Sequence, residues 1–192
     1  AAVAIALVIH WQSSPQLSND PIAANLNGHP ILAPGPVQLP GGAALYYLPG
    51  VGELAVEGPA VLELVDTKRL RLDRGRIRVA VHEPSGLGFE VATSQGVITD
   101  LGTEFAVEVN DLSGTNLVVF DGKVDLTIPR SSGEPIVERL VGGEAVRFAR
   151  SGEMDRIASI FASGMDGLLP SGRQASEDSP IIVNVGDNLP AS

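Results

Sequence analysis

The chain has 192 residues, enough for one domain with flanking segments. Hydrophobic residues make up 44% of it and aromatic residues only 4%, so Val, Leu, Ile and Ala must pack the core, and the β-branched share of these favours strands. The net charge of −10 argues against general binding to nucleic acid, whose phosphates attract positive charge, and the lack of cysteine excludes disulfides and thiolate metal sites.

The N-terminal segment is apolar from Ala1 to Ile9 and ends in His10-Trp11. Crossing a bilayer takes ~20 residues. We therefore interpret residues 1–11 as the end of a transmembrane helix whose start lies outside this sequence, with Trp11 at the membrane interface. A buried strand and the stub of a signal peptide are alternatives that stay open. Residues 12–40, rich in Pro, Ser, Asn and Gly, are predicted to be a linker.

Residues 41–150 carry short runs in which apolar and polar side chains alternate, the period of a half-buried strand. Leu54 and Val56, for example, alternate with glutamates. Turn signals separate the runs at intervals of about 8 to 12 residues, and Asp73-Arg74-Gly75 is interpreted as one such turn. We therefore predict an all-β domain of mostly antiparallel short strands, arranged as a sandwich or as a solenoid-like coil.

The strongest pattern lies between Gly96 and Ile128. After Thr103, the residues Phe105, Val107 and Val109 alternate with polar residues and are predicted to face the core. Gly102 interrupts an apolar path, which indicates a bulge or a sharp corner of the chain.

The pair Asp121-Gly122 stands between two further apolar runs. An Asp-Gly pair in this position is typical of a two-residue hairpin, because a type I′ turn needs φ > 0 at both central residues. The sequence therefore predicts a hairpin here, followed by a strand with three core residues: Val124, Leu126 and Ile128.

The character of the sequence changes after Arg150. Residues 151–163 are predicted to contain a short helix over Met154–Phe161, with Ile157, Ile160 and Phe161 on one side. Residues 164–192, rich in Gly, Ser, Pro and Asp, are predicted to be a linker toward a domain beyond the sequence.

Several of these blocks resemble the FecR family. Asp100 to Val107, followed by Asp121 to Val124, resembles the centre of the FecR domain, and the similarity extends over residues 41–148. The resemblance marks a structural motif: Gly102, Thr103, Phe105, Asp121 and Gly122. It implies an extracytoplasmic β domain in the cell envelope, held by one transmembrane helix. An anti-sigma segment in the cytoplasm would then relay a signal from an outer-membrane receptor.

A basic stripe is the candidate partner-binding surface. If two strands flank the predicted turn at residues 73–75, the outward face of that hairpin carries four arginines: Arg69, Arg71, Arg76 and Arg78. His82 continues this face. Such a stripe could orient an acidic partner segment beside an open sheet edge, to which that segment would add as a strand. Reversing Arg76 and Arg78 to Glu should then slow association without unfolding the domain. The alternative, left open, is pairing with glutamates on neighbouring strands: Glu53, Glu57 and Glu63.

No catalytic set is found in the sequence. The three histidines lack metal-ligand spacing. Glu104 and Glu108 on one strand would stand ~13 Å apart, too far for paired-carboxylate chemistry. We therefore expect a non-enzymatic module without metal or cofactor, which binds a protein partner and no nucleic acid. A structural or adhesive module of a cell-surface protein is the alternative function.

Overall fold

The computed structural model describes residues 25–26, 29–82, 84–110 and 114–157. Within them the regular structure is strand, apart from one 3-10 turn, η1 (Pro84–Gly86). The strands in chain order are β1 (Asn25–Leu26), β2 (His29–Pro30), β3 (Gly35–Leu39), β4 (Ala43–Leu48), β5 (Gly52–Asp66), β6 (Arg69–Val81), β7 (Glu90–Ala92), β8 (Val97–Asp100), β9 (Glu104–Asn110), β10 (Gly114–Asp121), β11 (Lys123–Ile128), β12 (Ile136–Val141), β13 (Ala145–Phe148) and β14 (Met154–Arg156).

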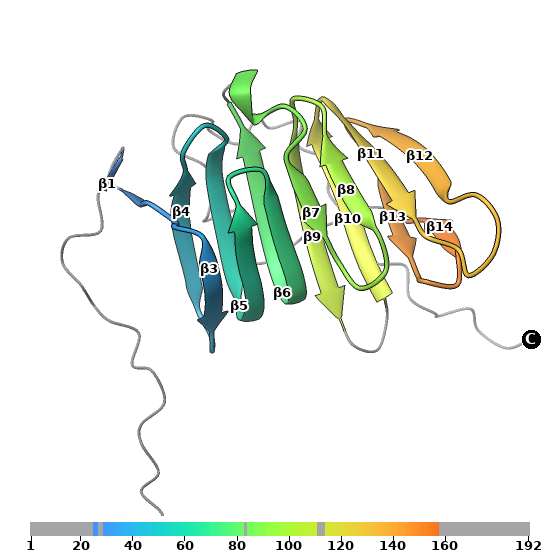
Figure 1. Ribbon diagram of the computed structural model, residues 1–192, viewed down its shortest axis with the longest axis horizontal. Coiled ribbons are helices and arrows are strands. Elements are labelled where there is room, and N and C mark those ends of the chain that lie inside the picture. Colours follow the sequence, from blue (N-terminus) through green and yellow to red (C-terminus); the bar gives the residue numbers. More distant parts are fainter. Residues whose placement is uncertain (1–24, 27–28, 83, 111–113, 158–192) are drawn as a thin grey trace, which may run out of the picture.

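Apart from the small β1–β2 pair, the strands form one continuous curled sheet (Figure 1). Its main path runs β12-β11-β8-β7-β6-β9-β10-β13-β14, and β5 lies along the other edge of β6 with β3 and β4 beside it. Every pair of these strands is antiparallel except β6–β7. The prediction of a mostly antiparallel all-β domain is therefore confirmed for the described residues.

The β5–β6 hairpin is long, and it bends in the middle. Gly58, Pro59 and Ala60 of β5 lie opposite Gly75 of β6, so the register shifts there. Gly75 has φ +107°, and a Cβ built on it would lie 2.5 Å from the Cβ of Ala60. The predicted turn at residues 73–75 is thus wrong: β6 continues through these residues and changes direction within the strand.

This bend folds the sheet into two layers. The first layer contains β4, the start of β5, the end of β6, β9, β10, β13 and β14. The second contains β3, the end of β5, the start of β6, β7, β8, β11 and β12. Buried side chains of both layers form a single core cluster between them. A Cβ on Gly96, for instance, would lie 3.1 Å from Phe148 of the first layer and 3.5 Å from Leu126 of the second.

Short corners carry the chain from one layer to the other. The first, at Gly102 (φ +91°), connects β8 to β9, which confirms the predicted corner. The second, at Gly122 (φ +81°), connects β10 to β11. These two strands do not pair with each other: β10 pairs with β9 and β13, and β11 pairs with β8 and β12. The predicted Asp121-Gly122 hairpin is therefore wrong, although the positive φ is present.

The corners are hydrogen bonded to one another. A third corner, at Gly142, connects β12 to β13. The amide of Leu101 donates to the carbonyl of Lys123 (3.1 Å), and that of Gly142 donates to the carbonyl of Gly122 (3.0 Å). This stacking gives the sandwich a solenoid-like coil. Gly102, Gly122 and Gly142 recur at intervals of 20 residues, a repeat that the sequence contained and that the pattern of turns did not reveal.

The predicted core positions are confirmed. Phe105, Val107, Val109, Val124, Leu126 and Ile128 are all buried. Two other predictions need correction. Within residues 12–40, expected to be a linker, the structure has β1, β2 and β3, and Met154–Arg156, expected in a helix, forms β14 at the sheet edge. Each of these segments finds a neighbouring strand to pair with, which local composition does not reveal.

The predicted transmembrane stub, residues 1–11, lies outside the described residues, as does the part of the predicted helix after Ile157. Among the described residues, no helix is long and apolar enough to cross a membrane.

Candidate functional site

The four arginines of the predicted stripe do not share one surface. In the second layer, odd-numbered residues of β6 point outward, and Leu70 and Leu72 are buried. Beyond Gly75 the alternation changes phase, so that Ile77 is buried and even-numbered residues point outward. Because the two outer faces lie on opposite sides of the sandwich, no single partner segment can follow all four arginines: Arg69 and Arg71 on one face, Arg76 and Arg78 on the other.

Each of these arginines is paired with carboxylates. On the second layer Arg69 binds Glu90 (2.7 Å), and Arg71 binds Glu63 (2.8 Å) and Asp73 (3.2 Å). Their guanidinium groups are half exposed, so these pairs contribute little to stability. The pairing with glutamates that the sequence left open is thus present for Arg71.

The pairs on the first layer are better shielded. Arg76 bridges two strands, binding Glu57 of β5 (2.9 Å) and Glu108 of β9 (3.0 Å). Arg78 binds Glu104 (2.6 Å) with its side chain 9% exposed, and its guanidinium lies 4.2 Å from the centre of the Phe120 ring. Such a buried guanidinium is a structural group, and reversing its charge would place two carboxylates side by side. Reversal of Arg76 and Arg78 is therefore expected to destabilise the domain, contrary to the expectation from sequence.

Arg78→Ala is expected to lower the free energy of unfolding by about 3 kcal/mol, because it leaves the buried carboxylate of Glu104 without its closest cation. Arg71→Ala is the matched control: its guanidinium is 53% exposed, so the change should stay within about 0.5 kcal/mol. Urea denaturation of both variants at one pH measures the difference. Equal losses in the free energy of unfolding would show that burial does not make the Arg78–Glu104 pair more stabilising than an exposed pair.

His82, the last residue of the predicted stripe, lies outside this network. Its Nε2 is 3.6 Å from Oε2 of Glu53, a side chain that is only 5% exposed. Among the described residues, that oxygen accepts no hydrogen bond. His82 is itself half exposed, and in its protonated form it would place a positive charge beside a buried carboxylate.

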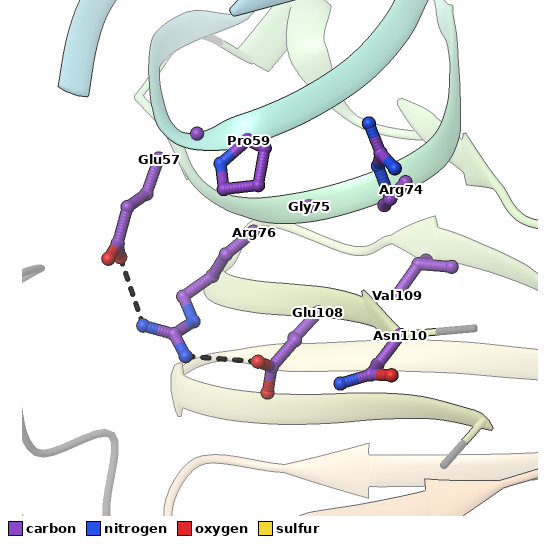
Figure 2. A pocket seen from close by; sticks show the side chains of 9 residues that line it. Glu57, Pro59, Arg74, Gly75, Arg76, Glu108, Val109 and Asn110 are labelled. Atoms are coloured by element: carbon purple, nitrogen blue, oxygen red, sulfur yellow. Dashed lines mark hydrogen bonds and ion pairs between the residues drawn. The ribbon is translucent and has the colours of Figure 1, made fainter. Parts of the chain in front are cut away.

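A hollow of about 330 Å³ lies where β5 and β6 bend (Figure 2). Glu57, Arg76 and Glu108 line one side and are joined to one another by ion pairs, as the dashed lines in Figure 2 show. The remaining wall is formed by the bend and the end of β9: Gly58, Pro59, Arg74, Gly75, Val109 and Asn110. The hollow therefore presents paired charges and backbone, and it brings together no nucleophile with a base.

A second polar cluster stabilises the first corner. The carboxylate of Asp100, which is fully buried, accepts hydrogen bonds from the amide of Gly102 (2.9 Å) and from the hydroxyl of Thr103. The Thr103 hydroxyl also contacts the carbonyl of Lys123 (2.8 Å) and so connects two corners. These contacts explain why Gly102 and Thr103 belong to the structural motif. Asp100 was not among the predicted motif residues, because the alternation of side chains could not reveal its role.

The buried position of Asp100 makes the stability of the domain dependent on pH. Desolvation raises the pKa of this carboxyl above its ordinary value, and the hydrogen bonds from Thr103 and Gly102 offset this only in part. A raised pKa in the folded state means that this group stabilises the fold below its unfolded-state pKa and loses that contribution as pH rises through the folded-state value.

The free energies of unfolding of the parent chain and of the Asp100→Asn variant are therefore expected to differ by an amount that changes with pH. In the window from the ordinary pKa of 3.8 upward to the raised value, the parent should lose stability relative to the variant, whose amide does not titrate. Denaturation at a series of pH values measures this difference. A difference that is constant across the window, or that changes in the opposite direction, would contradict the assignment.

In the part of the chain that the structure describes, no group of three His, Asp or Glu side chains is placed to hold a metal ion. The polar clusters of both layers are instead ion pairs and corner hydrogen bonds. The geometry thus defines the class of protein: a two-layer, coiled β-sheet domain. The charged side chains described above form ion pairs within this domain.

The comparison with known proteins gives a family match for part of the chain. The family model described as FecR protein matches residues 60–125, from the second half of β5 to the middle of β11. The resemblance found in the sequence is thus confirmed. No curated protein matches the chain.

The fold also occurs in solved structures. Two crystal structures of a "putative anti-sigma factor" from Parabacteroides distasonis ATCC 8503 superpose with a TM-score of 0.53 and 21% identity. The aligned part covers 63% of this chain and 58% of that protein. At this identity the likeness concerns the fold, and the chain spans little more than half of its structural relative.

Proposed function

We propose that this chain is the non-enzymatic β domain of a membrane-anchored regulator that binds a protein partner in the cell envelope and relays its occupancy to an anti-sigma segment. The observation that carries the proposal is the FecR match, which spans the end of β5, all of β6 and the first two corners. The shared fold with a protein described as a "putative anti-sigma factor" supports the same class.

The arginines of the described surface offer a partner little net positive charge. The arginines are already paired with carboxylates, so a partner gains little by approaching any one of them for charge alone. A partner on the first layer would meet Arg76, and a partner on the second would meet Arg69 and Arg71. Such charges at an interface mainly set the rate of association and its dependence on salt.

The proposal is tested with the full-length gene in its own host. Deleting the segment that encodes residues 60–125 should change the transcripts that depend on one alternative sigma factor, as measured by RNA sequencing of deletion and parent strains. Unchanged transcription combined with loss of surface attachment would instead favour the structural or adhesive module. The deletion strain complemented with the parent gene is the control.

A further inference from the structure

The ends of the curled sheet differ in how well their edge strands are protected. At one end, β3 contains Pro36, and β4 is covered by residues 31–32, since the amide of Leu32 donates to the carbonyl of Tyr47 (2.9 Å). At the other end, β14 has only three residues. The remaining edge strand, β12, has six residues, no proline and no bulge in its pairing with β11. Within the described residues, β12 therefore offers the longest regular open edge.

The outward backbone groups of β12 can be assigned from its hydrogen bonds. Gly142, directly after the strand, donates its amide to Gly122 on the β11 side, whereas Val141 donates its amide to the carboxylate of Glu144 (2.9 Å). Successive amides of an extended strand point to opposite sides. The N–H and C=O groups of Val137 and Arg139 therefore point away from β11 and face the open edge.

Along this edge two exposed valines flank an exposed arginine that is paired with an aspartate. Val137 is 61% exposed and Val141 42%, among the most exposed large hydrophobic residues of the described chain. Between them, Arg139 forms two hydrogen bonds with Asp125 (2.7 and 2.8 Å), and the arginine holds the pKa of Asp125 below its usual range. On the inner side, Glu138 is paired with Arg156 (2.9 Å).

We infer that β12 accepts an extended segment of a protein partner, which adds to the sheet as an antiparallel strand. Backbone hydrogen bonds to Val137 and Arg139 would supply the affinity. Val137 and Val141 would each face an apolar residue of the partner, and these two partner residues would be four positions apart. Arg139 would face the residue midway between them and favours an acidic side chain there. The inference rests on the proposed function, because it specifies where the partner binds.

A second copy of this chain fits the edge less well. Two β12 strands paired antiparallel about a twofold axis would place either Arg139 opposite Arg139 or Glu138 opposite Glu138 when most of the strand is paired. Like charges directly opposite each other destabilise a sheet. The charges of β12 therefore favour a partner of different sequence.

The open edge is tested first by amide hydrogen exchange, followed by NMR on the dilute 192-residue chain. The amides of Val137 and Arg139 should exchange roughly 100-fold faster than those of Glu138 and Leu140, which face β11. Equally slow exchange of all four amides would mean that the edge is already covered, and would overturn the inference. Protection that appears only at high protein concentration would assign the edge to self-association and would overturn it too.

Binding is tested with a synthetic peptide, Lys-Lys-Val-Val-Asp-Leu-Val-Ile-Lys. It follows the sequence of β11, which already pairs with β12, with valine at the positions that would face Val137 and Val141. Addition of the peptide should slow the exchange of the outward amides. Val137→Pro, which removes one of them, should weaken peptide binding about tenfold.

Val137→Ile is the matched control, since it keeps both the amide and an apolar side chain and should bind the peptide as the parent chain does. Both variants should melt within a few degrees of the parent, because the amide of residue 137 takes no part in the pairing with β11. Equal peptide affinity of Val137→Pro and the parent would overturn the inference. Val137→Pro could leave sigma-dependent transcription unchanged while deletion of residues 60–125 alters it. That result would overturn partner binding at β12 and leave the proposed function intact.

Discussion

Gly122→Val is expected to lower the free energy of unfolding by about 3–5 kcal/mol. Gly122 has φ +81°, where a β-branched residue is strained. A Cβ at this position would overlap the carbonyl oxygen of Gly102 and lie 3.1 Å from the Cα of Thr103. Both are backbone atoms of the neighbouring corner, so the clash can be relieved only by separating the two corners. Urea denaturation, with circular dichroism at a single pH, measures the loss.

The variant Gly133→Val separates backbone strain at positive φ from the clash with a neighbouring corner. Gly133 also has positive φ (+90°), but no atom lies within 4 Å of a Cβ built on it. This control should carry the backbone strain alone, about 1–3 kcal/mol. Equal losses for the two variants would mean that close packing of the corners does not contribute.

Phe105→Ala is expected to cost about 3–5 kcal/mol and to leave the domain close to its unfolding threshold. The ring is fully buried in the single core cluster between the two layers. Its removal therefore leaves a cavity that rigid strands on both sides cannot close. Thermal and urea denaturation measure the effect.

Leu101→Ala, four residues earlier, serves as the control for Phe105→Ala. Leu101 is 39% exposed at the first corner, so its truncation should cost less than about 1 kcal/mol. A Phe105 variant as stable as the Leu101 variant would contradict the central place of Phe105 in the core.

The strands and their buried faces could be predicted from local sequence. Alternation in β9 and β11 identified Phe105, Val107 and Leu126 as core residues, because side chains on successive residues of a strand point to opposite faces. Gly102 likewise indicated a corner, since a glycine that interrupts an apolar strand pattern is typical of a change in direction.

The partners of those strands could not be predicted in this way. Asp121-Gly122 satisfies the positive φ of a hairpin turn and equally that of a corner between layers, so the local signal is the same for both. The choice depends on whether β10 finds a better neighbour in β9 and β13 than in β11, which is a long-range property.

For the candidate surface too, local sequence revealed the residues and only the tertiary structure revealed their arrangement. The arginines of β6 were evident in the sequence, but their separation onto opposite faces depends on a change of alternation at Gly75, opposite Gly58 and Pro59 of another strand. The open edge of β12 was likewise invisible, because an edge is defined by the absence of a neighbouring strand among the described residues.

The sequence by itself thus determined the all-β class, the core side of each central strand and the resemblance to the FecR family, because these depend on residues close together in the chain. Only the tertiary structure decided which strands pair, where β6 bends, which carboxylates neutralise each arginine and which edge stays open. These features depend on contacts between residues far apart in the sequence, such as Arg78 with Glu104 and Gly122 with Gly142, whose energies no local pattern contains.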